Sequence, residues 1–330
     1  MSSKQNLLII GATGYIGTHI TSQILANKTS FGRTAIFTSP HTVEKKPDII
    51  DGLKKQGAEI IVGDTTNEDD LVKAFQGIIN SFSPLQMNKH NHKRRRRAIV
   101  ASQTTWIKLA SQSPTVTRFF PSEYGTDIEY GPESATEKPH QAKLQVRAAL
   151  RELEAEAKGK GEGKGLEYTF LVTGPYAEAV LRAASFDVKG KKAVLMGDGK
   201  GRISLTTKDD VGRLTVKALL HPSASKNRAL RVNSFTASEL DILAEFERQT
   251  GGEKWSVQHM PFEELRRLES EAWEKGDPMA TGYTLRRIWA EGGTLYEERD
   301  NGLVDGEDTE GLGDAVGVAV ASQVGQGSHL

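Results

Sequence analysis

Four apolar residues lead directly into a glycine-rich turn near the start of the chain, and this arrangement constrains the fold more than any other feature. The apolar run is Leu7-Leu8-Ile9-Ile10, and it stops at Gly11. A continuous apolar run of this length is typical of a central parallel strand that is covered on both faces. Beyond the turn, Ile16, Ile20 and Ile24 recur every four residues and give a helix one apolar side. The pattern predicts a strand, a tight turn and a helix.

The three glycines of the turn each have a physical task. The first permits the tight turn, the second lets the backbone approach a pyrophosphate, and the third lets the helix pack closely against the strand. The start of the helix then offers free N–H groups and the positive end of its dipole to phosphates. The strand before and the helix after favour a dinucleotide site over an ordinary strand-to-helix turn. The residues expected to bind the cofactor phosphates are Gly11, Ala12, Thr13, Gly14, Tyr15, Ile16 and Gly17.

Strands and helices alternate along most of the chain. Apolar patterns predict strands at 34–38, 59–62, 118–120 and 168–172, and helices at 68–75 and 141–156. Such alternation implies right-handed crossovers and a doubly wound parallel sheet, the Rossmann arrangement of α/β proteins. The later strands are shorter, which suggests a smaller C-terminal substrate lobe. We expect a dinucleotide-binding domain over residues 1–172 and a substrate-binding lobe over residues 173–330, part of which returns to the sheet.

Two local patterns in the second half carry further expectations. Thr236-Ala-Ser-Glu239 has the spacing of a capping box and is expected to open a helix that ends near Gly251. From about Asp300 onward the chain is rich in glycine, aspartate and alanine, which is typical of a loose tail.

Charge and composition narrow the range of partners. Lys and Arg together number 43, as do Asp and Glu, so no overall field favours nucleic acid or an anionic membrane. The chain has no cysteine, which excludes disulfides, thiolate metal sites and cysteine nucleophiles and fits a reducing compartment. No apolar run approaches the length of a membrane span. We expect a cytoplasmic protein with a small-molecule substrate and neither nucleic acid nor membrane as partner, while the sequence leaves the oligomeric state open.

The end of the second strand bears on which cofactor is preferred. A fold that prefers NAD places an acidic residue about 20 residues after the glycine turn, where it binds the ribose. Here that place is Thr38-Ser39-Pro40, and Lys45 and Lys46 follow soon after. A 2′-phosphate would therefore meet cations, which favours NADPH and adds Ser39, Lys45 and Lys46 to the expected cofactor site. The alternative is that both lysines are simply solvated.

The usual catalytic pair of a short-chain dehydrogenase, a tyrosine followed four residues later by a lysine, is missing. At that spacing Tyr124 is followed by Ile128, Tyr130 by Ser134 and Tyr168 by Val172. There is also no GxSxG elbow to support hydrolase chemistry. A residue other than this tyrosine must therefore act as the catalytic acid.

Several motifs in order resemble one family over most of the chain, the NmrA-like and isoflavone-reductase-like branch of atypical short-chain dehydrogenases, and fungal members above all. Besides the glycine turn, the motifs that carry the resemblance are Gly63-Asp64, Leu71-Val-Lys-Ala-Phe-Gln-Gly77, Phe119-Phe-Pro-Ser-Glu-Tyr-Gly-Thr-Asp127, Lys143-Leu-Gln-Val-Arg147 and Lys208-Asp-Asp-Val-Gly212. The resemblance implies an NADP-dependent oxidoreductase of a small molecule, in some relatives within secondary metabolism.

Within this family the lysine of the KxxxR helix is taken to be catalytic, and Lys143 is its counterpart. A positioned ammonium can stabilise or protonate the group on which charge develops when hydride reaches a carbonyl, iminium or conjugated alkene. The alternative is a helix-surface lysine that pairs with a nearby acid. By the same resemblance Tyr124 and Tyr176 border the substrate pocket, although either side chain could instead belong to the core.

The stretch 80–97 departs from the family pattern. Ile78-Ile79 begins a fourth strand, but a basic stretch that ends in Lys93 to Arg97 then replaces the expected apolar run. It is either an inserted loop or a fault in the deduced sequence. The five cations are interpreted as a solvated loop rather than a nuclear-localisation or phosphate-binding patch. His90 and His92 lack nearby acidic ligands, so no metal site is expected.

Two functions of different classes remain. The leading hypothesis is an NADPH-dependent reductase of a small conjugated, carbonyl or iminium substrate. The alternative is a non-catalytic sensor that binds NADP and regulates a partner protein. Retention of Lys143 favours the enzyme, whereas the departure at 80–97 favours the sensor.

Overall fold

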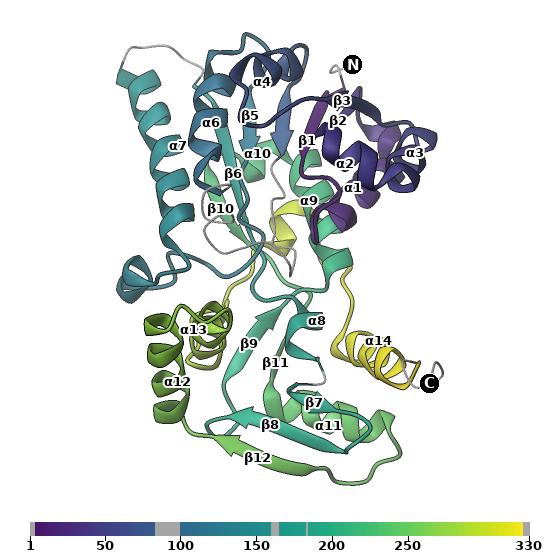
Figure 1. The fold of residues 1–330 in the computed structure, drawn as a ribbon, viewed down its shortest axis with the longest axis vertical. Coiled ribbons are helices and arrows are strands. Elements are labelled where there is room, and N and C mark those ends of the chain that lie inside the picture. Colours follow the sequence, from purple (N-terminus) through teal and green to yellow (C-terminus); the bar gives the residue numbers. More distant parts are fainter. Residues whose placement is uncertain (1–3, 83–99, 160–164, 183, 326–330) are drawn as a thin grey trace. The chain divides into compact units, whose positions relative to one another are not determined.

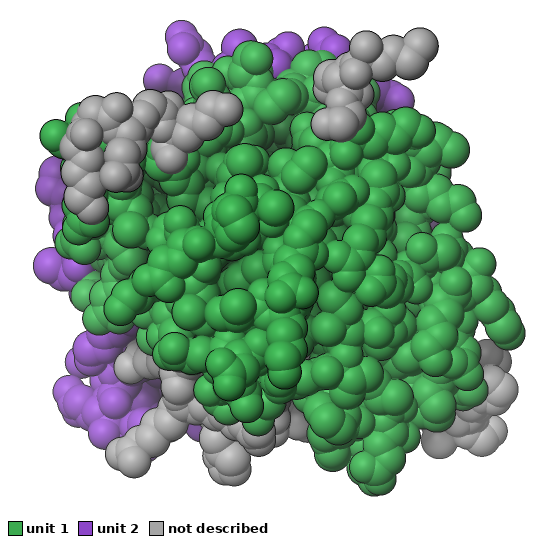
Figure 2. Space-filling model, turned by 90° about the horizontal axis from the view of Figure 1, so that it is seen from above, with its two compact units in different colours: residues 1–124, 140–171, 211–230 green, residues 125–139, 172–210, 231–330 purple. Residues whose placement is uncertain are grey.

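The computed structural model describes residues 4–82, 100–159, 165–182 and 184–325. These residues form two compact units, which Figure 2 shows in different colours. Unit 1 consists of residues 1–124, 140–171 and 211–230. Unit 2 consists of residues 125–139, 172–210 and 231–330.

A seven-stranded sheet forms the centre of unit 1 (Figure 1), in the order β10-β6-β5-β4-β1-β2-β3. Its strands are β1 (Leu7–Ile10), β2 (Thr34–Thr38), β3 (Glu59–Val62), β4 (Asn80–Phe82), β5 (Arg118–Phe120), β6 (Glu167–Val172) and β10 (Arg228–Arg231). β1 pairs in parallel with β2 on one side and with β4 on the other, so the strand order reverses beside β1. The β2–β3, β4–β5 and β5–β6 pairs are also parallel. The predicted α/β class with a doubly wound parallel sheet is confirmed.

Helices cover both faces of this sheet (Figure 1). The helices and helical turns around it are α1 (Gly17–Ala26), η1 (Lys28–Ser30), α2 (Pro40–Lys45), α3 (Pro47–Lys55), α4 (Glu68–Phe75), α6 (Gln103–Gln112), α7 (Gln141–Gly159), α9 (Lys208–Leu220) and α10 (Pro222–Ser225). Side chains of α4, α6 and α7 share one buried core with Leu8 and Ile10 of β1. Because side chains alternate along a strand, Leu7 and Ile9 are buried on the opposite face. On this face α9 packs closely on α1: a Cβ on Gly212 would lie 2.7 Å from the His19 carbonyl oxygen.

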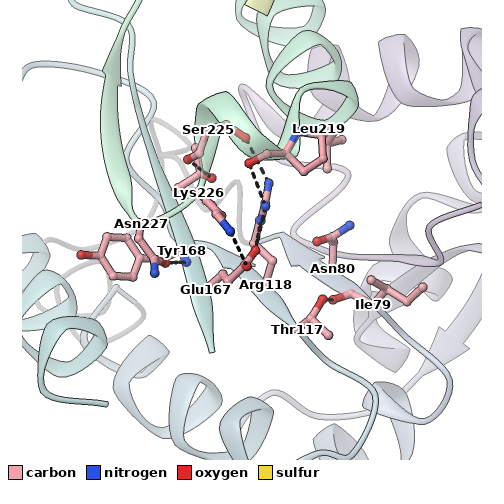
Figure 3. Close-up of polar contacts among 12 residues, drawn as sticks. Ile79, Asn80, Thr117, Arg118, Glu167, Tyr168, Leu219, Ser225, Lys226 and Asn227 are labelled. Carbon is pink, nitrogen blue, oxygen red and sulfur yellow. Dashed lines mark hydrogen bonds and ion pairs between the residues drawn. The ribbon is translucent and has the colours of Figure 1, made fainter. Parts of the chain in front are cut away.

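A polar cluster lies at the amino-terminal edge of the sheet (Figure 3). Arg118 and Glu167 are the first residues of β5 and β6 and lie directly opposite each other in register. The Arg118 guanidinium donates to Glu167 Oε2 at 2.7 Å, to Ser225 Oγ at 3.0 Å and to the Pro222 carbonyl at 3.1 Å. We call Arg118 and Glu167 the amino-edge pair. It joins both strands to the turn that leads into β10.

Unit 2 has two small sheets and a core of its own. The three-stranded sheet has the order β12-β8-β7 and the two-stranded sheet pairs β11 with β9. The elements of this unit are η2 (Pro132–Thr136), α8 (Ala177–Val180), β7 (Phe186–Asp187), β8 (Lys192–Met196), β9 (Arg202–Leu205), β11 (Phe235–Ser238), α11 (Glu239–Gln249), β12 (Ser256–Met260), α12 (Phe262–Glu274), α13 (Ala280–Ala290), η3 (Asn301–Val304) and α14 (Leu312–Gly325). Phe186 and Phe246 stack at the centre of its core, with ring centroids 5.1 Å apart.

Two local expectations for this part of the chain are wrong. The capping box that opens α11 is formed by Ser238 and Asp241 instead of Thr236 and Glu239, because residues up to Ser238 pair with β9 as strand β11. The stretch after Asp300 is also ordered: it contains η3 and the helix α14. Ala315 and Val316 of α14 are buried in the core of unit 2, and this burial stabilises a helix whose composition alone resembles a tail.

In the part of the chain that the structure describes, no helix is both long enough and apolar enough to cross a membrane.

Candidate active site

The glycine turn connects β1 to α1 as predicted, and its backbone is tightly folded. Gly11 has φ +97°, a conformation that side-chain-bearing residues rarely adopt. The Gly14 N–H donates to the Gly11 carbonyl at 3.0 Å. A Cβ on Gly17 would lie only 2.1 Å from that same carbonyl oxygen. The close contact between turn and helix therefore requires glycine at position 17.

The first turn of α1 is suited to an anion. No side chain caps its N-terminus at Ile16, and the first turn contains no acidic residue. Backbone N–H groups and the positive end of the helix dipole are thus not opposed by a local carboxylate. Such a terminus after a glycine turn is a common binding site for phosphate groups.

The residues after β2 lie at the same edge of the sheet, because β1 and β2 are parallel. Ser39 caps α2, its Oγ accepting the Thr42 N–H at 3.2 Å. Lys46 reaches the glycine turn: its Nζ donates to the Thr13 carbonyl at 3.0 Å. Lys45 instead has a side chain that is 64% exposed, and its nearest acid is Glu44 at 3.7 Å. The structure thus brings Lys46, but not Lys45, to the turn.

The loop after β5 leads to Tyr124, one of the two tyrosines expected to border the substrate pocket. The Ser122 N–H donates to Oε1 of the fully buried Gln103 at 2.9 Å, and the Glu123 N–H donates to the Pro121 carbonyl at 2.8 Å. Together these hydrogen bonds fix the loop in a tight turn at the carboxyl-terminal edge of the sheet.

Lys143, in the first turn of α7, is half-buried beside this loop. Its Nζ donates to the Glu123 carbonyl oxygen at 2.5 Å. Burial lowers the pKa of Lys143, the Glu123 carboxylate opposes that change, and the Arg147 cation adds to it. The contact is to a backbone carbonyl, which differs from the surface pairing with an acid that was the alternative for this lysine.

Two residues without an individual role in the sequence-based predictions, Glu123 and Arg147, form an ion pair beside Lys143. Arg147 donates from Nε and Nη2 to the two carboxylate oxygens of Glu123, both at 3.0 Å. Both side chains are only 1% exposed. The guanidinium also lies 4.7 Å from the centroid of the Phe170 ring. We call Glu123 and Arg147 the carboxyl-edge pair. The available signal was the i, i+4 spacing of Lys143 and Arg147, which places both on one side of a helix.

The two tyrosines predicted to border the substrate pocket are both buried, Tyr124 in unit 1 and Tyr176 in unit 2. Burial raises the pKa of Tyr124, and the nearby Glu123 charge raises it further. Tyr176 forms an isolated bridge with Thr206 and follows Gly174, where a Cβ would lie 2.3 Å from the Ser204 carbonyl oxygen. Their contact with a substrate stays a prediction.

Part of the atypical stretch 80–97 lies outside the described residues, including His90, His92 and the run from Lys93 to Arg97; residues 80–82 form β4. Among residues that the structure does describe, no three His, Cys, Asp or Glu side chains are grouped so as to hold a metal ion.

Comparison with known proteins gives consistent matches. The model of the NmrA-like family matches residues 3–280. The oxidoreductase aprR of Aspergillus flavus is 30% identical over 283 residues, which cover 86% of each protein. A phenylcoumaran benzylic ether reductase of Pinus taeda is 28% identical over 278 residues, covering 81% of this chain and 82% of the relative.

A solved structure has the same fold. The binary complex of leucoanthocyanidin reductase with NADPH from Vitis vinifera superposes with a TM-score of 0.73 at 17% identity, covering 96% of this chain and 99% of the other. The resemblance inferred from the motifs is confirmed, and this chain belongs to the NmrA-like family.

Proposed function

We propose that this chain is an NADPH-dependent reductase of a small organic substrate that carries a conjugated alkene, a carbonyl or an iminium group. The observation that carries the proposal is the position of Lys143 at the carboxyl-terminal edge of the sheet that also holds the glycine turn. Only β4 lies between β1 and β5, and all three strands run parallel. At the usual strand spacing, the ends of β1 and β5 are about 10 Å apart. Open parallel sheets bind ligands at this edge, where the strand order reverses.

The residues after β1 and β2 fit a dinucleotide. Gly11 permits the tight turn and Gly17 lets α1 pack against it, so that the uncapped start of α1 can offer its backbone N–H groups to a pyrophosphate. At the end of β2, Ser39 offers a hydroxyl where an NAD-preferring protein has a carboxylate. The Lys46 ammonium at the turn would add a positive charge for a 2′-phosphate. When bound, NADPH supplies a hydride.

Lys143 would serve as the acid. When a carbonyl carbon accepts hydride, negative charge develops on the oxygen, and an ammonium within hydrogen-bond reach stabilises it or donates a proton. Burial brings the pKa of Lys143 below its ordinary value, which makes its proton easier to donate. Tyr124 and Tyr176 are proposed to border the reacting part of the substrate.

The relatives favour the enzyme over the regulator. Both curated relatives are named as an oxidoreductase or a reductase, and the oxidoreductase class predicted from the sequence agrees with those names. We further propose residues 1–172 as the cofactor domain and residues 173–330, part of which returns to the sheet, as the substrate lobe. The proposed location is the cytoplasm, and the proposed substrate class is a secondary metabolite.

Cofactor binding is tested with two neighbouring lysines as a matched pair. Binding of NADPH and NADH is measured by nucleotide fluorescence for wild type, Lys46→Met and Lys45→Met. We expect Lys46→Met to weaken NADPH binding about tenfold, the equivalent of one lost charge-assisted hydrogen bond. NADH binding and the Lys45→Met variant should change much less. If the wild type bound neither nucleotide, the cofactor assignment would be wrong.

The catalytic role is tested by Lys143→Ala and Lys143→Met. For any compound that the wild type reduces with NADPH, we expect turnover to fall by about 10²- to 10⁴-fold, the usual contribution of a general acid. NADPH affinity should stay close to that of the wild type. Full turnover in both variants would contradict the proposed chemistry.

A further inference from the structure

Helix α7 holds a single loop residue, Glu123, at two separate points. Lys143 donates to its backbone carbonyl at 2.5 Å, and Arg147 forms two hydrogen bonds of 3.0 Å to its side-chain carboxylate. Lys143 and Arg147 are four residues apart, so they project from the same side of the helix. The carbonyl that orients Lys143 and the carboxylate that binds Arg147 therefore both belong to Glu123.

The surroundings of Arg147 leave little freedom to this arrangement. Its guanidinium packs near the face of Phe170 on β6 while both carboxylate oxygens of Glu123 accept its hydrogen bonds. A forked, two-point contact of this kind sets orientation as well as distance. Lysine, in contrast, has a flexible side chain with four rotatable bonds. The carbonyl that receives its ammonium can orient it only while the loop itself stays in place.

We propose that Glu123 and Arg147 are positioning residues, which hold the loop carbonyl that places the ammonium of Lys143 for proton donation. The inference rests on the proposed function in one respect, namely that Lys143 acts in catalysis. Neither residue is assigned contact with the substrate. Arg147 acts through Glu123, and Glu123 acts through its own carbonyl.

The charges of the pair also act on Lys143, and this gives a readout that needs no substrate. Burial has the largest effect on the pKa of Lys143 and lowers it. Within the described part of the chain, the charges that act on it are Glu123, which raises its pKa, and Arg147, which lowers it. Neutralising one partner at a time should therefore move the pKa of Lys143 in opposite directions.

The amino-edge pair supplies a matched control (Figure 3). Arg118 and Glu167 also form an arginine–glutamate pair on the same sheet, with a buried arginine and a half-buried glutamate, but at the opposite end of β5. Arg118 is 4% exposed, so its substitution tests the general effect of breaking such a pair. Lys143 lies at the other edge of the sheet, so its pKa should not change when Arg118 is substituted.

The experiment measures the pKa of Lys143 directly and needs no substrate. Full-length protein is labelled with a limiting amount of acetic anhydride at a series of pH values, and the acetylated fraction of Lys143 is read by mass spectrometry. We expect the pKa of Lys143 to fall in Glu123→Gln, to rise in Arg147→Gln and to stay unchanged in Arg118→Gln. Glu123→Gln keeps an acceptor oxygen for Arg147, so it tests the inference even if Arg147→Gln fails to fold.

A fourth variant separates geometry from charge. Arg147→Lys keeps a positive charge but cannot form the two-point contact with the Glu123 carboxylate. The pKa of Lys143 should therefore stay near the wild-type value while kcat falls. A displacement of about 1 Å can cost about 10²-fold in rate, and we expect a loss between tenfold and a hundredfold with KM for NADPH unchanged.

The outcomes distinguish this inference from the proposed function. An unchanged pKa of Lys143 in both Glu123→Gln and Arg147→Gln, or an equal shift in Arg118→Gln, would overturn the positioning role. If the opposite shifts appeared but Lys143→Ala kept full turnover, the pair would still set the state of Lys143 and the proposed reductase mechanism would fail. Wild-type turnover in Arg147→Lys would contradict the geometric part of the inference.

Discussion

The amino-edge pair and the carboxyl-edge pair join an arginine to a glutamate at opposite ends of one strand, β5, and their partners differ. At the amino edge, the remaining donors of Arg118 bind Ser225 Oγ and the Pro222 carbonyl, and Glu167 is 32% exposed with Lys226 as a second partner at 3.7 Å. At the carboxyl edge both side chains are 1% exposed. There the backbone carbonyl of the glutamate holds a third residue, Lys143.

Both are arginine–glutamate ion pairs, so the residue types alone do not indicate what each pair does in the protein. The amino-edge contacts all tie strands and a turn together, so they serve stability. The carboxyl-edge pair fixes a loop whose carbonyl accepts a hydrogen bond from the Lys143 ammonium, and we propose that it also positions that lysine. Burial adds to the contrast, since a glutamate that water can reach tolerates the loss of its arginine better than one that is enclosed.

The largest effect on stability is expected for Arg147→Met. It leaves the Glu123 carboxylate enclosed without its arginine, which usually costs about 3–5 kcal/mol. Urea unfolding followed by circular dichroism measures the change, with Arg151→Met as control, because Arg151 is exposed one turn further along α7 and also lies near Phe170. A loss no larger than that of the control would remove the contrast between the two edges.

A smaller loss is expected for Arg118→Met. Glu167 keeps water and Lys226 as partners, while the buried Ser225 hydroxyl and the Pro222 carbonyl lose a donor, so we expect about 1–3 kcal/mol. NADPH-dependent turnover at a temperature where the variant is folded should match that of the wild type. A selective drop in kcat would show that the amino edge also influences the site.

The smallest effect is expected for Lys226→Met. Its ammonium is 3.7 Å from Glu167 and its side chain is 54% exposed, so the surrounding water screens the interaction. We expect a loss of about 0.5 kcal/mol or less in the same urea experiment. A loss as large as that of Arg118→Met would mean that Lys226, and not Arg118, holds Glu167.

Much of the fold could be predicted from the sequence because its signals are local. The apolar run before Gly11, the glycine spacing and the isoleucines of α1 each depend on residues within one turn or strand. Where the prediction of a local pattern was wrong, a longer-range contact decided. Thr236 has the spacing of a helix cap, but pairing of β11 with β9 extends the strand to Ser238. Burial of Ala315 and Val316 stabilises α14 in the same way.

The candidate site could be predicted only in part for the same reason. The glycine turn, which is proposed to bind the cofactor phosphates, is one continuous motif, so its position follows from spacing. The carboxyl-edge pair joins residues 24 positions apart in the chain, and nothing in either motif indicates which side chain of the other it meets. Likewise, adjacent lysines such as Lys45 and Lys46 are indistinguishable in a sequence, although only Lys46 contacts the turn.

The three-segment construction of unit 1 has a consequence for how this protein is made. Its sheet order ends with β6 and then β10, which comes almost 60 residues after β6 in the chain. During translation β6 therefore leaves the ribosome before the strand that covers its open side exists. Until Arg228–Arg231 emerges, the backbone hydrogen-bonding groups on that side of β6 remain unpaired and available to other chains. Synthesis that stops short of residue 228 would therefore leave an aggregation-prone product, and chaperone demand should be greatest in the interval between the two strands.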